Sequence, residues 1–160
     1  MTGELDRAEL RRTFAHFPSG VVAVCAQVDG TPVGMAASSF TSVSLVPPLV
    51  SVCVDHGSTT WPVLQSAGVL GISVLSAEQA AAGRQLSRRG VDRFEGVRLR
   101  HAPSGAVLVE GAAAWLECRV DDVVLAGDHD IVVMEVTRTA TNGGDPLVFH
   151  DSRFRRLEVG

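Results

Sequence analysis

The amino-acid sequence predicts a mainly β protein that folds as a closed or nearly closed antiparallel barrel with a few peripheral helices. Short runs rich in β-branched residues recur along the chain, and turn-forming residues separate most of them. The dipeptide Asp29-Gly30 stands between two of these runs and favours a tight hairpin. The runs do not alternate regularly with helical segments, which argues against a parallel doubly wound sheet.

The first predicted element is a helix over 6–17 that ends before Pro18. Asp6 and Glu9 have the spacing of a capping box, and proline cannot continue the helix. The apolar residues of the segment fall on one stripe at helical spacing, and they are Leu10, Phe14 and Phe17.

Extended segments are predicted on both sides of the Asp29-Gly30 turn, the first of them starting near Gly20. Four later runs have the composition of strands, and they cover 49–54, 69–75, 112–120 and 131–136. Strands therefore dominate the predicted fold.

Two helical insertions are predicted at the periphery of the barrel. One starts near Thr59, with Ser58 as its N-cap, and ends before Gly68. The other opens at a capping box formed by Ser76 and Gln79.

Length and composition indicate one globular domain over 1–160. The chain has a mass of 16.9 kDa, with 46% hydrophobic and 20% charged residues, and it lacks the apolar run of about 18 residues that a membrane helix needs. Its start carries acidic residues and no apolar signal segment, so we expect a cytoplasmic protein. A net charge of -4 argues against binding to nucleic acid or to a membrane surface, and a small-molecule ligand is the better expectation.

Common catalytic and metal-binding signatures are absent from the sequence. Neither GxxxxGK[ST], GxGxxG, HExxH nor GxSxG occurs. Cys25, Cys53 and Cys118 are widely separated and lie in apolar surroundings, so we expect three reduced core residues. Asp128, His129 and Asp130 form a carboxylate and imidazole cluster, but alternation along a strand directs the histidine away from both aspartates. We therefore predict no metal site.

Three separated segments carry a resemblance to a known family. They are 19–61, which contains MAASSF and DHGSTTW, then RFEGV at 93–97, and finally GDHDIVVMEV at 127–136 followed by PLVFHDSRF at 146–154. In their order and spacing they resemble the flavin reductase-like family, above all the small reductase component of two-component flavin-dependent monooxygenases. The resemblance implies a Greek-key FMN-binding split barrel. It also implies an NAD(P)H:flavin oxidoreductase that uses NADH or NADPH and FMN or FAD.

The MAASSF run is the family segment that borders the flavin ring. Small side chains leave room for a flat ring, and backbone and hydroxyl groups can bond its polar edge. The implied ring-binding residues are Met35, Ala36, Ala37, Ser38 and Ser39. A tightly packed strand without a ligand is the alternative interpretation of such a run.

The family loop for the ribityl and phosphate groups corresponds to the segment that precedes the first helical insertion. Its implied binding residues are Cys53, Val54, Asp55, Ser58, Thr59 and Thr60. A helix N-terminus attracts anions, although Ser58 could also serve only as a cap. Relatives often place a basic residue where this chain has His56, and Arg93 is expected to compensate. Phe94 is expected to pack beside the flavin, whereas Arg88 and Arg89 are interpreted as surface charges.

The histidine of the GDH tripeptide, His129, is implied to hold the nicotinamide against the flavin. Asp128 and Asp130 would shape the turn or orient the imidazole, and a purely structural turn histidine is the alternative. Weaker candidates for nicotinamide or ADP contacts come from the segment FHDSRF, and they are Phe149, His150 and Arg153. Phe149 stands where the family commonly has tyrosine.

The resemblance also implies a homodimer and a separate flavin-dependent monooxygenase as partner. Two other functions stay open at this point. One is a flavin-binding protein without productive nicotinamide use, and the other is a split-barrel flavoenzyme that reduces another organic acceptor. Fold alone does not choose among them.

Overall fold

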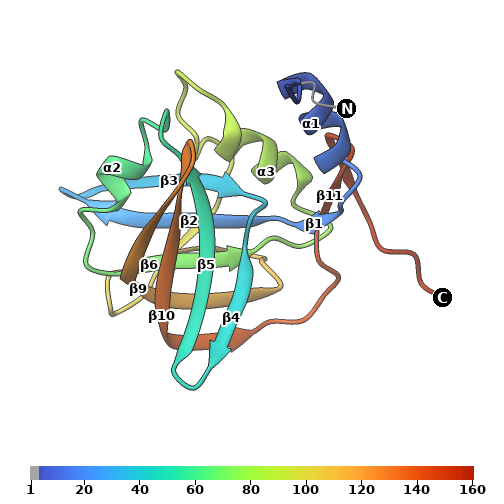
Figure 1. Ribbon diagram of the computed structural model, residues 1–160. Coiled ribbons are helices and arrows are strands. Elements are labelled where there is room, and N and C mark those ends of the chain that lie inside the picture. Colours follow the sequence, from blue (N-terminus) through green and yellow to red (C-terminus); the bar gives the residue numbers. More distant parts are fainter. Residues whose placement is uncertain (1–3) are drawn as a thin grey trace.

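The structure is a computed structural model that describes residues 4–160, and a seven-stranded antiparallel sheet dominates it (Figure 1). The strand order is β3-β2-β6-β9-β10-β5-β4. The strands are β2 (Val22–Val28), β3 (Thr31–Ala37), β4 (Thr41–Leu45), β5 (Pro48–Asp55), β6 (Leu70–Val74), β9 (Ala114–Ala126) and β10 (His129–Thr141). The two edge strands, β3 and β4, follow each other in the chain without pairing in the described region, so the barrel is split. The predicted antiparallel split barrel is therefore confirmed.

Smaller elements surround this sheet. They are α1 (Arg7–Phe14), α2 (Trp61–Leu64), α3 (Ala80–Ser87), β1 (Ser19–Gly20), β7 (Leu99–His101), β8 (Val107–Val109), β11 (Val148–His150) and β12 (Arg153–Arg155). Strands β1, β11 and β12 form a second antiparallel sheet, and β7 pairs with β8. No helix in the described part of the chain has both the length and the apolar character to cross a membrane.

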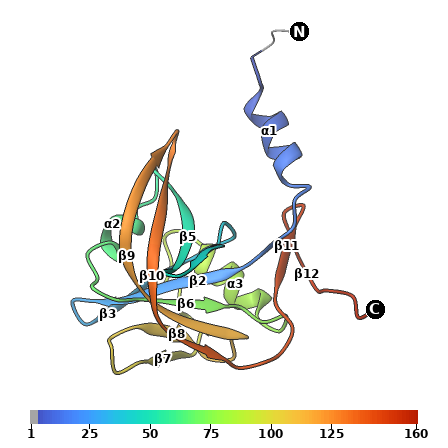
Figure 2. The same ribbon diagram turned by 60° about the horizontal axis from the view of Figure 1, so that its bottom comes forward.

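Helix α1 stands away from the barrel (Figure 2). Asp6 caps it, since the Ala8 amide donates to the carboxylate across 3.2 Å, but the helix ends at Phe14 instead of residue 17. Its apolar stripe is not covered by the described part of the chain, because α1 has no buried residue and Phe14 and Phe17 are 69% and 80% exposed. An unburied apolar stripe offers surface to another molecule.

Strand β2 is buried on both faces. Successive side chains of a strand point to opposite sides. Val22, Val24 and Ala26 face the barrel interior with β5, β6 and β10, whereas Val21, Ala23 and Cys25 face an outer cluster with α3 and β8. One strand therefore serves two cores.

The hairpin predicted at Asp29-Gly30 is confirmed. Both residues have positive φ, 50° and 75°, and the turn joins β2 to β3. The four later predicted runs are also strands. Strands β9 and β10 are longer than predicted, because β9 continues to Ala126 and β10 begins at His129, and together they form a long hairpin that projects beyond the barrel (Figure 2). Sequence patterns miss this extension because both of its faces are largely exposed.

The two predicted helical insertions exist at the barrel rim, but the first is shorter than expected and the second begins only at Ala80. Helix α2 has one turn, because the Ser66 and Ala67 amides bond carbonyls three residues back and tighten the chain. Trp61 and Leu64 of α2 are buried in the barrel interior, so this peripheral helix contributes to the core of the barrel. Before α3, the Gln79 side chain accepts from the Ser76 amide across 3.0 Å, which is half of the predicted capping box.

Gly71 allows two layers of chain to approach closely. A Cβ atom at this position would overlap the Val107 carbonyl oxygen and lie 2.7 Å from its carbon, both of them backbone atoms. Backbone atoms move less readily than a flexible side chain. A glycine in β6 is therefore required where β8 crosses it.

We expect Gly71→Ala to lower the free energy of unfolding by roughly 1 to 3 kcal/mol, the usual cost of overpacking. Gly68→Ala is the matched control, because nothing lies within 4 Å of a Cβ added there. Urea unfolding followed by circular dichroism measures both. Equal stability of the two variants would contradict the close crossing.

Candidate functional site

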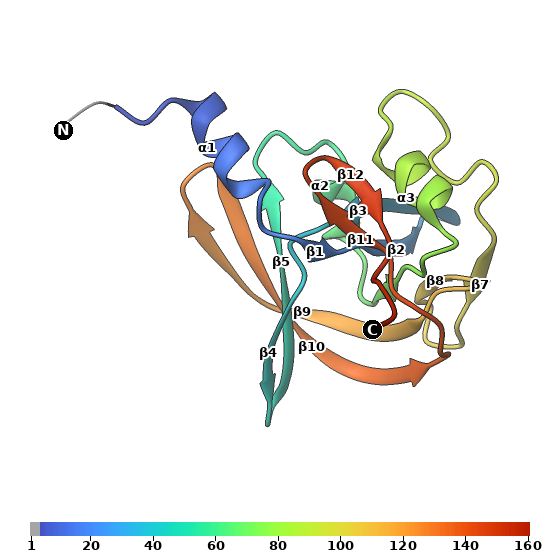
Figure 3. The ribbon, with the colours of Figure 1, turned by 90° about the vertical axis from the view of Figure 1, so that its right-hand side faces the viewer.

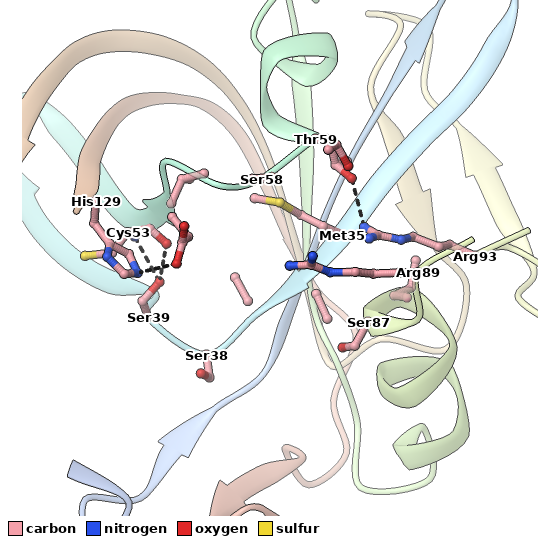
Figure 4. Close-up of a pocket in the computed structure, with 16 residues that line it drawn as sticks. Met35, Ser38, Ser39, Cys53, Ser58, Thr59, Ser87, Arg89, Arg93 and His129 are labelled. Atoms are coloured by element: carbon pink, nitrogen blue, oxygen red, sulfur yellow. Dashed lines mark hydrogen bonds and ion pairs between the residues drawn. The ribbon is translucent and has the colours of Figure 1, made fainter. Parts of the chain in front are cut away.

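A cavity of about 400 Å³ opens beside the split edge of the barrel (Figure 4). Ligand pockets in proteins commonly have volumes of this order. Four segments line it: the end of β3, the end of β5 with the loop to α2, the end of α3 with its following loop, and the start of β10. The lining residues are Met35, Ala36, Ala37, Ser38, Ser39, Cys53, Val54, Asp55, Ser58, Thr59, Thr60, Leu86, Ser87, Arg89, Arg93 and His129.

The MAASSF segment forms one wall of this cavity, as predicted. Pairing of β3 with β2 brings Ala36 opposite Ala23 and Ala37 opposite Val22, so small side chains border the open space. Ser39 lines the cavity and also makes a structural contact. Its hydroxyl accepts from the Cys53 amide at 2.9 Å and donates to the Cys53 carbonyl at 3.2 Å. Ser39 therefore links the segment to β5, which uses its hydroxyl proton and leaves one lone pair to accept a bond from a ring edge.

The loop between β5 and α2 is folded on itself by short bonds. The Gly57 amide donates to Asp55 Oδ1 at 2.6 Å, and Ser58 Oγ accepts from the Trp61 amide at 3.1 Å. Ser58 thus bonds the first residue of α2, but the N-cap position is Thr60 and not the predicted Ser58, because the helix starts two residues later than expected. A single helical turn sums few peptide dipoles, so the expected contribution of the helix dipole to anion binding is small here. Hydroxyl groups and side-chain cations remain as the anion-binding groups.

His129 lies at the start of β10, directly after the two-residue turn at Gly127 and Asp128. Its Nδ1 is 2.7 Å from Asp128 Oδ1, and its Nε2 is 4.0 Å from Asp55 Oδ2. The hydrogen bond with His129 and then the imidazole's charge lower the pKa of the Asp128 carboxyl. An ionised carboxylate only accepts hydrogen bonds, so Nδ1 carries the proton and Nε2 is left for a ligand.

The expected opposition of His129 to both aspartates is therefore wrong for Asp128. This residue lies in the turn and not in a strand, so alternation does not apply to it. Asp130 bonds instead to His56, with 2.9 Å between Oδ1 and Nε2. The His56 amide also donates to the Asp128 carbonyl at 2.9 Å. These bonds join the β5–α2 loop to the turn that carries His129.

Two arginines line the cavity at the end opposite His129 (Figure 4). Arg93 was expected here. Arg89 is exposed, as expected of a surface charge, but it also lines the cavity, whereas Arg88 bonds to Gln85 and lies outside it. Leu86 and Ser87 were also missed. Leu86, Ser87 and Arg89 reach the cavity because the end of α3 packs against β3. This tertiary contact has no local sequence signal.

Four predicted residues do not line this cavity. Phe94 packs in the outer cluster, where its Cζ would lie 2.8 Å from a Cβ added to Gly34, so it fills the core and not the site. Phe149 lines a smaller adjoining cavity of about 100 Å³, and His150 lines another beside α1. Arg153 is exposed and lines none of these cavities.

The three cysteines divide into two kinds. Cys25 and Cys118 are buried, and burial raises the pKa of each thiol to about 12, with the charge of Glu117 adding to the effect at Cys118. The core assignment is confirmed for these two. It is wrong for Cys53, which is exposed and lines the cavity, because its side chain leaves β5 on the face opposite Val52 and Val54.

Several known proteins are similar to this chain in sequence and in fold. A flavin reductase of Pseudomonas putida is 38% identical over 148 residues, which are 91% of this chain and 87% of that protein. The reductase component of a 4-nitrophenol 4-monooxygenase/4-nitrocatechol 2-monooxygenase of Rhodococcus opacus is 37% identical over 150 residues, 94% of this chain and 80% of that one. The solved structure of Streptomyces globisporus C-1027 NADH:FAD oxidoreductase SgcE6 in complex with NAD and FAD fragments matches with a TM-score of 0.90 at 38% identity, covering 98% of each chain.

The family described as flavin reductase like domain matches residues 14–158, which is most of the chain. The match includes every segment that lines the cavity of about 400 Å³. This chain belongs to the flavin reductase like domain family.

Proposed function

We propose that this protein is an NAD(P)H:flavin oxidoreductase that reduces FMN or FAD. The observation that carries the proposal is the convergence of three predicted segments on one cavity. The small-residue wall at 35–39, the hydroxyl-rich loop at 58–60 and the histidine of the β9–β10 turn all line it. The relative from Streptomyces globisporus is an NADH:FAD oxidoreductase, which supports NADH and FAD as the preferred pair.

The lining residues fit a flavin. Ala36 and Ala37 have small side chains that leave room for the ring along one wall. The Thr59 side chain lies toward the cationic end of the cavity (Figure 4), and the Thr60 hydroxyl bonds to Arg93 there. When bound, the flavin accepts a hydride from the reduced nicotinamide. The protein's own contribution is to align the two molecules, because alignment supplies much of the rate in such transfers.

His129 is suited to hold the carboxamide of the nicotinamide. Asp128 fixes the proton on Nδ1, so in the neutral imidazole Nε2 offers a lone pair to a carboxamide N–H. The side chain is 40% exposed, which leaves it accessible from solvent. Asp128 acts through the imidazole as a positioning residue.

The reduced flavin is proposed to pass to a separate monooxygenase in the cytoplasm. The relative from Rhodococcus opacus is the reductase component of a two-component enzyme, which supports a separate partner. The cavity of about 400 Å³ also leaves little room for a third ligand beside a flavin and a nicotinamide. Product formed by an oxygenase across a dialysis membrane would support diffusion of free reduced flavin, and product formed by this chain alone would contradict it.

The protein is also proposed to be a homodimer. Apolar side chains at the tips of two hairpins and on α1 are strongly exposed, among them Leu45 at 91%, Val46 at 92% and Leu125 at 74%. Figure 3 shows the β4–β5 tip at the opposite end of the molecule from α1 and the β9–β10 tip. Exposed apolar surface of this kind favours self-association.

The purified protein is expected to oxidise NADH only when FMN or FAD is added. Absorbance at the reduced nicotinamide band measures the rate with each flavin and with NADPH in place of NADH. Flavin-independent oxidation, or no oxidation with any flavin, would refute the reductase function.

We expect His129→Ala to reduce kcat/KM for NADH by roughly 5-fold to 150-fold, the loss of one hydrogen bond of about 1 to 3 kcal/mol. Flavin affinity is expected to stay nearly unchanged. His101→Ala is the matched control, because His101 is exposed on β7 and outside the cavity. If both variants behave alike, His129 serves only the turn.

Light scattering is expected to give twice the chain mass of 16.9 kDa at micromolar concentration. Replacing Leu45 and Val46 together by aspartate provides the comparison, because it removes the most exposed apolar pair in the β4–β5 connection. A monomeric wild-type protein would rule out the dimer.

A further inference from the structure

The two arginines of the cavity have different hydrogen-bonding roles. Arg93 Nε donates to the Arg88 carbonyl at 2.7 Å, and its Nη1 donates to the Gly34 carbonyl at 3.2 Å and to Thr60 Oγ1 at 3.0 Å. These bonds tie the loop after α3 to β3 and to the start of α2. Arg93 therefore acts mainly as a clamp between elements of the fold.

Arg89 has no comparable partner. Across residues 4–160, no hydrogen bond or ion pair engages its guanidinium, although the side chain reaches into the cavity alongside Arg93 (Figure 4). His129, Cys53 and Ser39 lie at the other end of the cavity. An exposed cation without a protein partner thus lines the end of the cavity that is far from the proposed nicotinamide contact.

We infer that Arg89, and not Arg93, is the cation that recognises the phosphate of a bound flavin, as the monophosphate of FMN or the pyrophosphate of FAD. This inference rests on the proposed function. A guanidinium matches phosphate oxygens with two parallel hydrogen bonds, and all its donors here are available. The Thr60 hydroxyl accepts from Arg93, so its own proton is free to donate toward the same anion.

Other basic groups are less suited to this role. His56, which stands where a basic residue was expected, bonds to Asp130 and does not line the cavity. The net charge of -4 gives a phosphate no overall attraction to the protein. Recognition of the phosphate therefore depends on a local cation.

Flavin affinity separates the roles of the arginines without any measurement of turnover. Flavin fluorescence titrations give Kd for FMN, FAD and riboflavin, which lacks the phosphate. Arg89→Gln is expected to weaken FMN and FAD binding by about 10-fold or more, the usual effect of losing a bond to a charged group, and to change riboflavin binding by less than about 2-fold. Added salt should weaken FMN binding to the wild type more than to this variant.

Two further variants complete the test. Arg88→Gln is the control, because that guanidinium bonds to Gln85 outside the cavity, and it should leave all three affinities unchanged. Arg93→Gln should lower the thermal midpoint and weaken riboflavin and FMN alike. Equal FMN affinity of Arg89→Gln and Arg88→Gln would overturn the inference while leaving flavin binding intact, as would a phosphate-selective loss in Arg93→Gln. A wild type that binds none of the flavins would overturn the proposed function as well.

Discussion

The burial of β2 on both faces is the constraint on which the rest of the structure depends. Its side chains Val22, Val24 and Ala26 fill the barrel, whereas Ala23 and Cys25, together with Val21 just before the strand, fill the outer cluster. A shift of one residue in register would exchange the two faces. The pairing of β2 with β3 and β6 is therefore fixed, and with it the position of the small-residue wall of the cavity.

The cavity is shaped as much by bonds between its own residues as by the sheet. Ser39 bonds the backbone of Cys53, Asp128 bonds the ring of His129, and Arg93 bonds three different segments. Such bonds hold the walls in place before any ligand arrives, and binding then costs less ordering of the protein. Residues identified as ligand-binding from sequence thus include several that serve the architecture.

Much of the fold could be predicted from the sequence because its signals are local. The Asp29-Gly30 turn and the β-branched runs report backbone preference and burial directly. The extension of the β9–β10 hairpin lacks such a signal, because its stability comes from pairing with a neighbouring strand. The site divides in the same way: MAASSF and GDH are recognisable segments, whereas Arg89 and Phe94 acquire their places only when the loop after α3 folds against β3.

The three thiols differ in exposure, so a thiol-specific reagent can modify the cavity residue Cys53 selectively. Thiolates, not thiols, attack alkylating reagents, and the raised pKa values of Cys25 and Cys118 keep both neutral in the folded state. Cys53 is the exposed member of the set, in a strand that the Ser39 hydroxyl bonds hold in place. A dye or spin label can therefore be attached beside the cavity of the unmutated chain, where its signal would report events at the mouth of the barrel.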